Sequence, residues 1–115
     1  MEESILNSIK KLLNCPDYDV FDIDIVIHIN TVLGILTDLG IGPSEGFFIT
    51  GKTERWEDFL GSDNKKFQGV KTFVYLKTKL IFDPPQNNST IECINNTIKE
   101  LEWRLNDKAE QGGWL

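Results

Sequence analysis

Four aspartates, Asp17, Asp19, Asp22 and Asp24, lie within eight residues of one another near the start of the chain. Carboxylate oxygens are ligands that Ca²⁺ prefers, so a calcium-binding loop is the first chemistry to consider. An EF-hand loop starting at Asp17 needs glycine where this chain has Asp22 and glutamate where it has His28. The calcium pattern therefore fails. We expect the cluster to cap a helix or to pair with lysines of this or a neighbouring subunit.

Other residues that could support catalysis are too few or wrongly spaced. His28 is the only histidine, which excludes a histidine-based triad or a multi-histidine metal site. Cys15 and Cys93 have no Cys-x-x-Cys spacing, and we expect two buried free thiols. The run 40–45 lacks the third glycine of a dinucleotide fingerprint and is typical of a helix stop followed by a turn. We therefore predict no enzymatic activity, no cofactor and no metal.

The stretch from Asn64 to Phe82 carries five lysines and no acid, a charge of +5 in a chain whose net charge is −6, which leaves −11 elsewhere. These lysines form either a solvated face balanced by acidic neighbours, which we favour, or a contact with DNA phosphates. The acidic balance disfavours wrapping around nucleic acid, because cationic side chains supply most of that affinity.

The residues that we single out for subunit or partner contacts are charged, with one exception. The exception is a tryptophan near the C-terminus that either packs locally or anchors an interface, since aromatic residues dominate binding hot spots. The full set is Asp17, Asp19, Asp22, Asp24, Lys65, Lys66, Lys71, Lys77, Lys79 and Trp103.

The length of 115 residues indicates one domain with a single hydrophobic core. No apolar run reaches the roughly 20 residues that span a bilayer, and the chain begins with Met1, Glu2 and Glu3 instead of a signal sequence, so we expect no membrane contact and a cytosolic protein. We assign residues 1–106 to one helical domain and residues 107–115 to a flexible C-terminal tail.

The pattern of apolar residues predicts four main helices. The first runs from about Glu3 to Leu13 and stops at Pro16. In the next segment Ile23, Ile25, Ile27 and Ile29 alternate with other residues, as in a strand, but the longer window shows a helical stripe of Ile25, Ile29, Val32, Leu33, Leu36 and Leu39. We predict one helix from Asp22 to Leu39.

The third main helix is predicted from Asn64 to Phe82, where apolar residues recur at helical spacing. Pro84 and Pro85 end it. Residues 40–61 form a long irregular loop in which Thr53 caps a short helical turn that ends at Leu60. Ser89 and Glu92 form a capping box for the last helix, whose stripe is Ile91, Ile94, Ile98, Leu101 and Leu105. The predicted fold is therefore all-α: a small bundle of four main helices with a short extra helical turn between the second and third.

Several of these stretches together resemble the small head-tail connector proteins of tailed bacteriophages and their prophage relatives. The resemblance runs from about Ile5 to Asn106. Its specific parts are the run Phe21 to Asn30, the turn from Leu39 to Pro43, the segment Trp56 to Gly61, the run Val70 to Pro85, and Glu102 to Asn106.

This resemblance implies an all-α, non-enzymatic structural protein of the virion neck, present in the host cytoplasm before assembly. Several copies would form a ring beneath the portal protein, with DNA only as passing cargo and a neighbouring neck or tail-completion protein as the next partner. The Asp17–Asp24 cluster and the Lys65–Lys79 face would set the register between subunits. The alternatives are a small helical nucleic-acid-binding regulator, or a neighbouring stopper or tail-completion protein.

Overall fold

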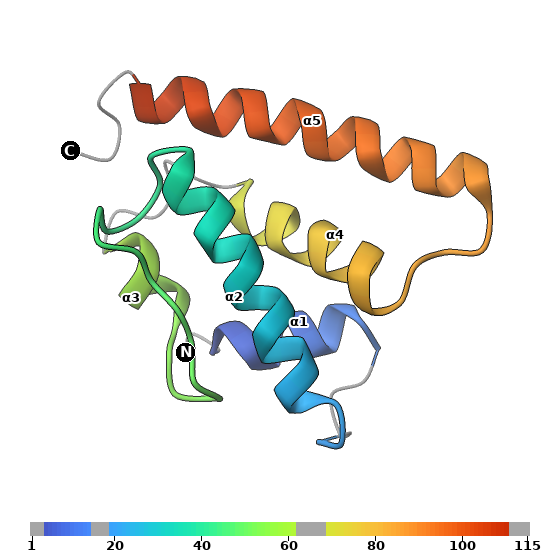
Figure 1. Ribbon diagram of the computed structural model, residues 1–115, viewed down its shortest axis with the longest axis horizontal. Helices are drawn as coiled ribbons and strands as arrows, with labels where there is room; N and C mark the ends of the chain where they lie inside the picture. Colours follow the sequence, from blue (N-terminus) through green and yellow to red (C-terminus); the bar gives the residue numbers. More distant parts are fainter. Residues whose placement is uncertain (1–3, 15–18, 62–68, 111–115) are drawn as a thin grey trace.

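The computed structural model describes residues 4–14, 19–61 and 69–110. Its helices are α1 (Ile5–Leu12), α2 (Asp22–Asp38), α3 (Trp56–Leu60), α4 (Val70–Phe82) and α5 (Asn88–Glu110), and no strand occurs within those ranges. Figure 1 shows α5 along one edge of the molecule, with α4 between it and α1. The all-α prediction, with four main helices and a short extra one, is confirmed.

Helix α1 is short and amphipathic. Its first turn is capped by Ser4, whose Oγ accepts a hydrogen bond from the backbone N–H of Asn7 at 3.0 Å. Ile5, Leu6 and Ile9 lie on one face and are buried in the core. The predicted start at Glu3 falls outside the described residues.

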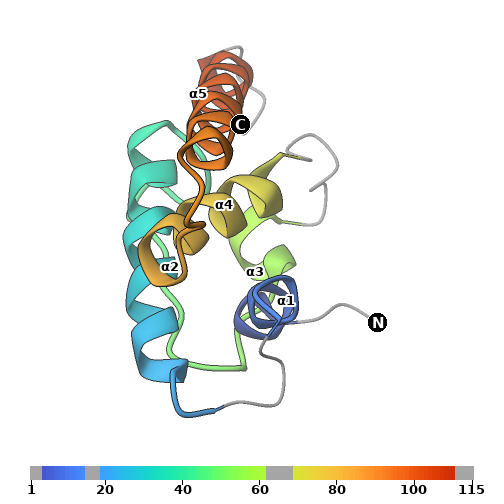
Figure 2. The same cartoon turned by 90° about the vertical axis from the view of Figure 1, so that its right-hand side faces the viewer.

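Helix α2 lies at the centre of the helix packing and contacts both α4 and α1 (Figure 2). The predicted stripe is confirmed, because five of its members are buried: Ile25, Ile29, Val32, Leu33 and Leu36. The helix begins as predicted and ends at Asp38, one residue earlier than predicted, where Gly40 adopts a positive φ of 89°. At the other end, the rings of Phe21 and Phe82 meet edge to face, with centroids 5.5 Å apart.

The segment from Gly40 to Arg55 follows α2 back along its length, held by side-chain hydrogen bonds. The Asn30 side chain donates to the carbonyl oxygen of Ile49 at 3.0 Å and accepts from its N–H at 2.7 Å. Helix α3 then begins at Trp56, with the carboxylate of Asp58 accepting from the N–H of Arg55. The prediction that Thr53 caps this turn was therefore wrong: the acid inside the turn satisfies the free N–H instead.

Helix α4 ends at Phe82, as the two prolines predicted, and buries Val70, Phe73, Val74 and Thr78. The helix begins at Val70, and Gly69 in the turn before it is the N-cap. The predicted start at Asn64 was therefore too early for this helix, and Asn64 itself lies outside the described residues. Helix α5 is capped by Asn87, whose Oδ1 accepts from the N–H groups of Ser89 and Thr90. The predicted cap at Ser89 was therefore two residues too late.

The C-terminal part of α5 is joined to the end of α2, because Asn106 donates from Nδ2 to the carbonyl oxygen of Leu39 at 3.2 Å. The helix continues to Glu110, past the predicted start of the C-terminal tail at residue 107. Flexibility of residues 111–115 stays a prediction, since they lie outside the described part. Cys93 is exposed on α5, which corrects the prediction that it is buried.

Candidate interaction surfaces

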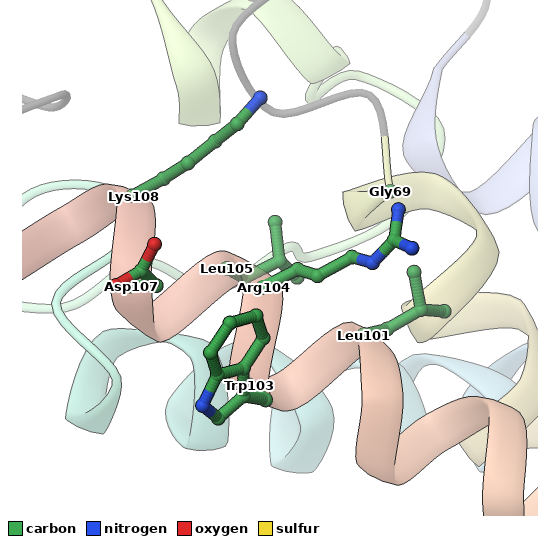
Figure 3. Close-up of a pocket in the computed structure, with 7 residues that line it drawn as sticks. All are labelled: Gly69, Leu101, Trp103, Arg104, Leu105, Asp107 and Lys108. Atoms are coloured by element: carbon green, nitrogen blue, oxygen red, sulfur yellow. The ribbon is translucent and has the colours of Figure 1, made fainter.

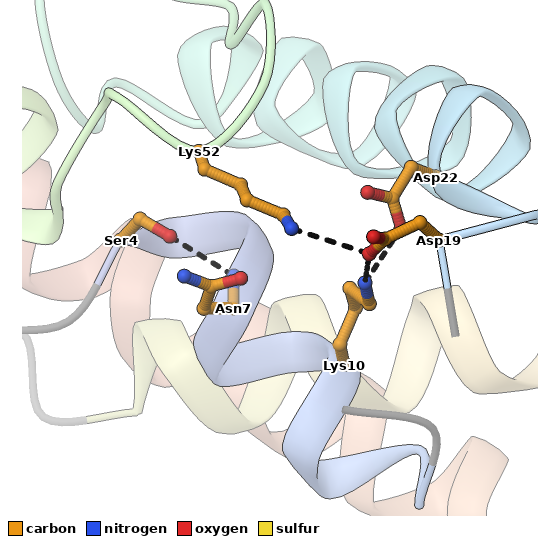
Figure 4. A network of polar contacts seen from close by, with 6 residues as sticks. All are labelled: Ser4, Asn7, Lys10, Asp19, Asp22 and Lys52. Carbon is orange, nitrogen blue, oxygen red and sulfur yellow. Dashed lines mark hydrogen bonds and ion pairs between the residues drawn. The ribbon is translucent and has the colours of Figure 1, made fainter. Parts of the chain in front are cut away.

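The aspartate cluster is engaged by lysines that sequence reasoning did not single out. Lys10 of α1 is fully buried, and its Nζ lies 2.9 Å from Oδ1 of Asp19 and 2.7 Å from Oδ1 of Asp22 (Figure 4). Lys52, from the segment after Ile49, reaches Asp19 at 3.2 Å. The cluster therefore ties α1, the start of α2 and the 50–52 segment together within one chain. The only sequence signal for Lys10 was its place in the last turn of an amphipathic helix.

Electrostatics favour the charged forms of Lys10 and Asp19. Burial of the ammonium group acts to lower the pKa of Lys10, but hydrogen bonds to Asp22 and Asp19 outweigh it, so the pKa of Lys10 is raised. The hydrogen bond from Lys10, with that from Lys52, lowers the pKa of the Asp19 carboxyl. Of the remaining cluster residues, Asp24 is exposed and Asp17 lies outside the described residues.

Two of the three central-helix lysines that the structure describes lie near acids of the same chain. Lys77 lies 3.6 Å from Glu102 of α5, and Lys79 lies 3.7 Å from Asp83 one turn later. Lys71 is exposed in the first turn of α4, while Lys65 and Lys66 fall outside the described residues. None of these lysines meets Asp19, Asp22 or Asp24 within the described part of the chain. A pairing between subunits stays a prediction.

Helix α2 carries a second apolar face that the sequence reading missed. Ile23 and Ile27 point away from the buried stripe and are 77% and 56% exposed, and Val20 just before the helix is 78% exposed. Phe48, 67% exposed, stands next to Ile49, which Asn30 holds against the same helix. We call Val20, Ile23, Ile27 and Phe48 the apolar ridge. The sequence signal for the ridge was the alternation of isoleucines from Ile23 to Ile29. Only Ile25 and Ile29 fit the buried helical stripe, so the other two must lie on another face.

A hollow of about 450 Å³ lies beside the ridge. It is floored by Leu6 and Val26, and Ile23, Ile27, Thr50 and Lys52 contribute to its walls. Ile23 and Ile27 of the ridge therefore share this hollow with Asp22 and Lys52 of the Lys10 cluster, so apolar side chains adjoin charged ones there.

A second feature lies at the other end of α2, where α5 passes the start of α4. A hollow of about 490 Å³, which we call the α5 groove, is lined by Gly69, Leu101, Trp103, Arg104, Leu105, Asp107 and Lys108 (Figure 3). Trp103 is 70% exposed, so most of its side chain is not packed against the rest of the chain. Its use as an interface anchor stays a prediction, and its position at the edge of a hollow is typical of such a role.

The described residues contain no group of three or more His, Cys, Asp or Glu side chains placed to hold a metal ion. Among the helices of residues 4–14, 19–61 and 69–110, none has the length and apolar character needed to cross a membrane.

Comparison with known proteins assigns the chain to a family. No curated protein and no solved structure matches the chain. A family model described as phage connector protein matches residues 5–112. The match extends six residues beyond Asn106, where the resemblance was expected to end, and so includes the C-terminal turns of α5. The chain belongs to the phage connector protein family, and its role is that of a phage structural connector.

Proposed function

We propose that several copies of this chain form a ring in the neck of the virion, beneath the portal protein, and join the head to the tail. The observation that carries this proposal is the match of residues 5–112 to the phage connector protein family. The ring presents one surface to the portal and another to the next neck or tail-completion protein, while DNA passes through it without being held.

The charge of the chain is compatible with a passage for DNA. A net charge of −6 gives a ring of such subunits a strongly negative field, which repels phosphates and lets the duplex slide. A protein that grips DNA needs uncompensated cations along one face, since phosphate neutralisation supplies its affinity. Here Lys77 and Lys79 each face an acid of the same chain, which weighs against a nucleic-acid-binding regulator.

Native mass spectrometry of the purified chain tests the proposal. A concentration series is measured alone and with the cognate portal protein, and a short DNA duplex is added in parallel at about 50 and 200 mM salt, a range over which phosphate-driven affinity falls steeply. We expect a closed multimer, free or on the portal, that leaves the duplex unbound at both salt concentrations.

Other results would reject the proposal in distinct ways. A dimer that binds the duplex, with affinity that drops sharply at higher salt, would identify a DNA-binding regulator. Binding to a completed tail structure in place of the portal would identify a neighbouring stopper or tail-completion protein. A chain that remains monomeric with the portal present would refute the ring itself.

A further inference from the structure

We propose that neighbouring copies of this chain meet head to tail, with the apolar ridge of one copy seated in the α5 groove of the next. This inference rests on the proposed ring and specifies its subunit contact. It commits each copy to two different surfaces, both built from described residues.

The first observation is that α2 is apolar on two opposite faces. One face fills the core through Ile25, Ile29 and Val32, whereas Ile23 and Ile27 of the other face lie in solvent. Apolar side chains exposed together on one helix face mark a surface that another chain can cover. The ridge is therefore the part of α2 that a second chain would cover.

The size of the ridge fits a subunit contact. Its four side chains are each more than half exposed, and together they leave on the order of 500 Å² of apolar surface in solvent. Interfaces are roughly 60% apolar, so a core of this size corresponds to about 800 Å² per partner, the usual size of a specific protein contact.

The α5 groove offers a complementary shape and composition. Leu101 and Leu105 supply apolar walls, and Trp103 stands at the edge as a large exposed ring (Figure 3). The exposed side chains of Val20, Ile23 and Ile27 would contact these apolar walls, with Trp103 packing beside them. Buried aromatic anchors of this kind carry much of the energy of protein contacts.

The charges beside the two surfaces are complementary. Asp24 is exposed directly beside Ile23 on the ridge, and within the described residues it forms no ion pair. Lys71 is exposed two residues beyond Gly69, which lines the groove, and it too has no ion-pair partner there. The ridge is therefore flanked by an acid and the groove by a base, and opposite charges of this kind favour association of the two surfaces.

The two surfaces are far enough apart to serve two neighbours at once. Asn106 fixes the groove region to Leu39 at the C-terminal end of α2, whereas Ile23 lies at its N-terminal end. Sixteen residues separate the two, which is roughly 24 Å of helix at 1.5 Å per residue. A contact between unlike surfaces repeats from copy to copy and closes into a ring when the rotation permits.

Complementation between two variants tests this arrangement. The ridge variant carries Ile23→Ser and Ile27→Ser, and the groove variant carries Trp103→Ser, all at exposed positions. Each alone should lose self-association by on the order of 30-fold, as truncation of a hot spot does. Mixed in equal amounts, they should form a 1:1 dimer, because one intact ridge still meets one intact groove and the chain cannot extend further.

The matched control is Ile81→Ser, which removes an exposed isoleucine from outside both surfaces. It should assemble as the wild type does, and far-ultraviolet circular dichroism checks that every variant is folded. Where the wild type assembles only on the portal, loss of loading onto the portal is scored instead. A charge exchange, Asp24→Lys with Lys71→Glu, should restore association that each single change weakens.

The outcomes separate this contact from the ring on which it depends. A wild-type ring that persists in the ridge and groove variants would overturn the surface assignment and leave the ring intact. Variants that lose assembly alone and fail to pair when mixed would overturn the head-to-tail arrangement in favour of a contact between like surfaces. A wild-type chain that stays monomeric at about 1 mM, with and without portal, would overturn both.

Discussion

Replacing Lys10 with methionine should destabilise the fold by removing the cation that holds Asp19 and Asp22. The ammonium is fully buried and lies 2.7 Å from Asp22 and 2.9 Å from Asp19. Methionine keeps the apolar stem and much of the volume, so the change isolates the charge. What remains is the Asp22 carboxylate, largely buried and without its cation.

The expected cost follows from the burial of the two acids. Removing one partner of a fully buried ion pair costs roughly 3–5 kcal/mol. The Asp22 side chain keeps 22% of its exposure, so water recovers part of that loss, and we expect about 2 kcal/mol. Asp19 adds little, because its side chain is 70% exposed and retains Lys52.

Urea unfolding followed by tryptophan fluorescence measures this cost. The indole of Trp56 is buried and donates to Ser8 Oγ at 2.8 Å, so its emission reports on the same part of the core. A loss of about 2 kcal/mol lowers the midpoint by about 1 M or more. The matched control is Lys52→Met, which removes an exposed pair and should cost about 0.5 kcal/mol or less. A Lys10→Met midpoint equal to that of the control would refute the reasoning.

The pH dependence gives an independent check. The pKa of Asp19 is lowered, so its contribution is present above the ordinary value of 3.8 and is lost as the pH falls further. The pKa of Lys10 is raised, so its contribution is present below 10.5 and is lost as the pH rises through its higher folded value. The difference between wild type and Lys10→Met should therefore be constant between about pH 5 and 9 and shrink outside that range.

Three further substitutions test the packing of the core and its loop. Thr78→Val should stabilise the protein by about 1 kcal/mol in urea unfolding, because Thr78 Oγ1 is buried without a hydrogen-bond partner. A loss of stability would mean that the hydroxyl does form a hydrogen bond in the folded protein. Gly42→Ala should cost about 2 kcal/mol or more in thermal unfolding, because Gly42 has a φ of +84° and a Cβ there would overlap the ring of Phe59. Asn30→Ala removes both hydrogen bonds to Ile49 and should speed hydrogen exchange at the Ile49 N–H by on the order of 10-fold or more. Unchanged exchange there would contradict the role of the Asn30 side chain in holding this segment.

Local patterns were sufficient to predict most of the helices. The stripe of α2 outweighed the strand-like alternation of its isoleucines because the buried positions recur at helical spacing from Ile25 to Leu36, a stretch longer than a typical strand. Pro84 and Pro85 fixed the end of α4 because proline removes a backbone donor. These effects depend on residues that are close in the sequence, so they can be read from the sequence without the structure.

Features that depend on distant residues were not predictable in the same way. The aspartates were expected to meet lysines of the central helix, but Lys10 and Lys52 reach Asp19 first, since α1 packs beside the start of α2. The cap of α5 was misplaced because Asn87 and Ser89 both have suitable side chains, and only the path of the preceding loop selects between them.

The alternation of isoleucines in α2 satisfies two demands that fall on the same helix. Ile25 and Ile29 fill the core, and loss of either would leave a cavity in the fold. Ile23 and Ile27 contribute little to the stability of the isolated chain, because they remain in solvent there. Their Ser variants should therefore unfold at nearly the wild-type urea concentration, while Ile25→Ser should unfold much earlier. Association and folding thus separate along one helix, so a defect of the ridge variant in assembly can be assigned to the contact between subunits.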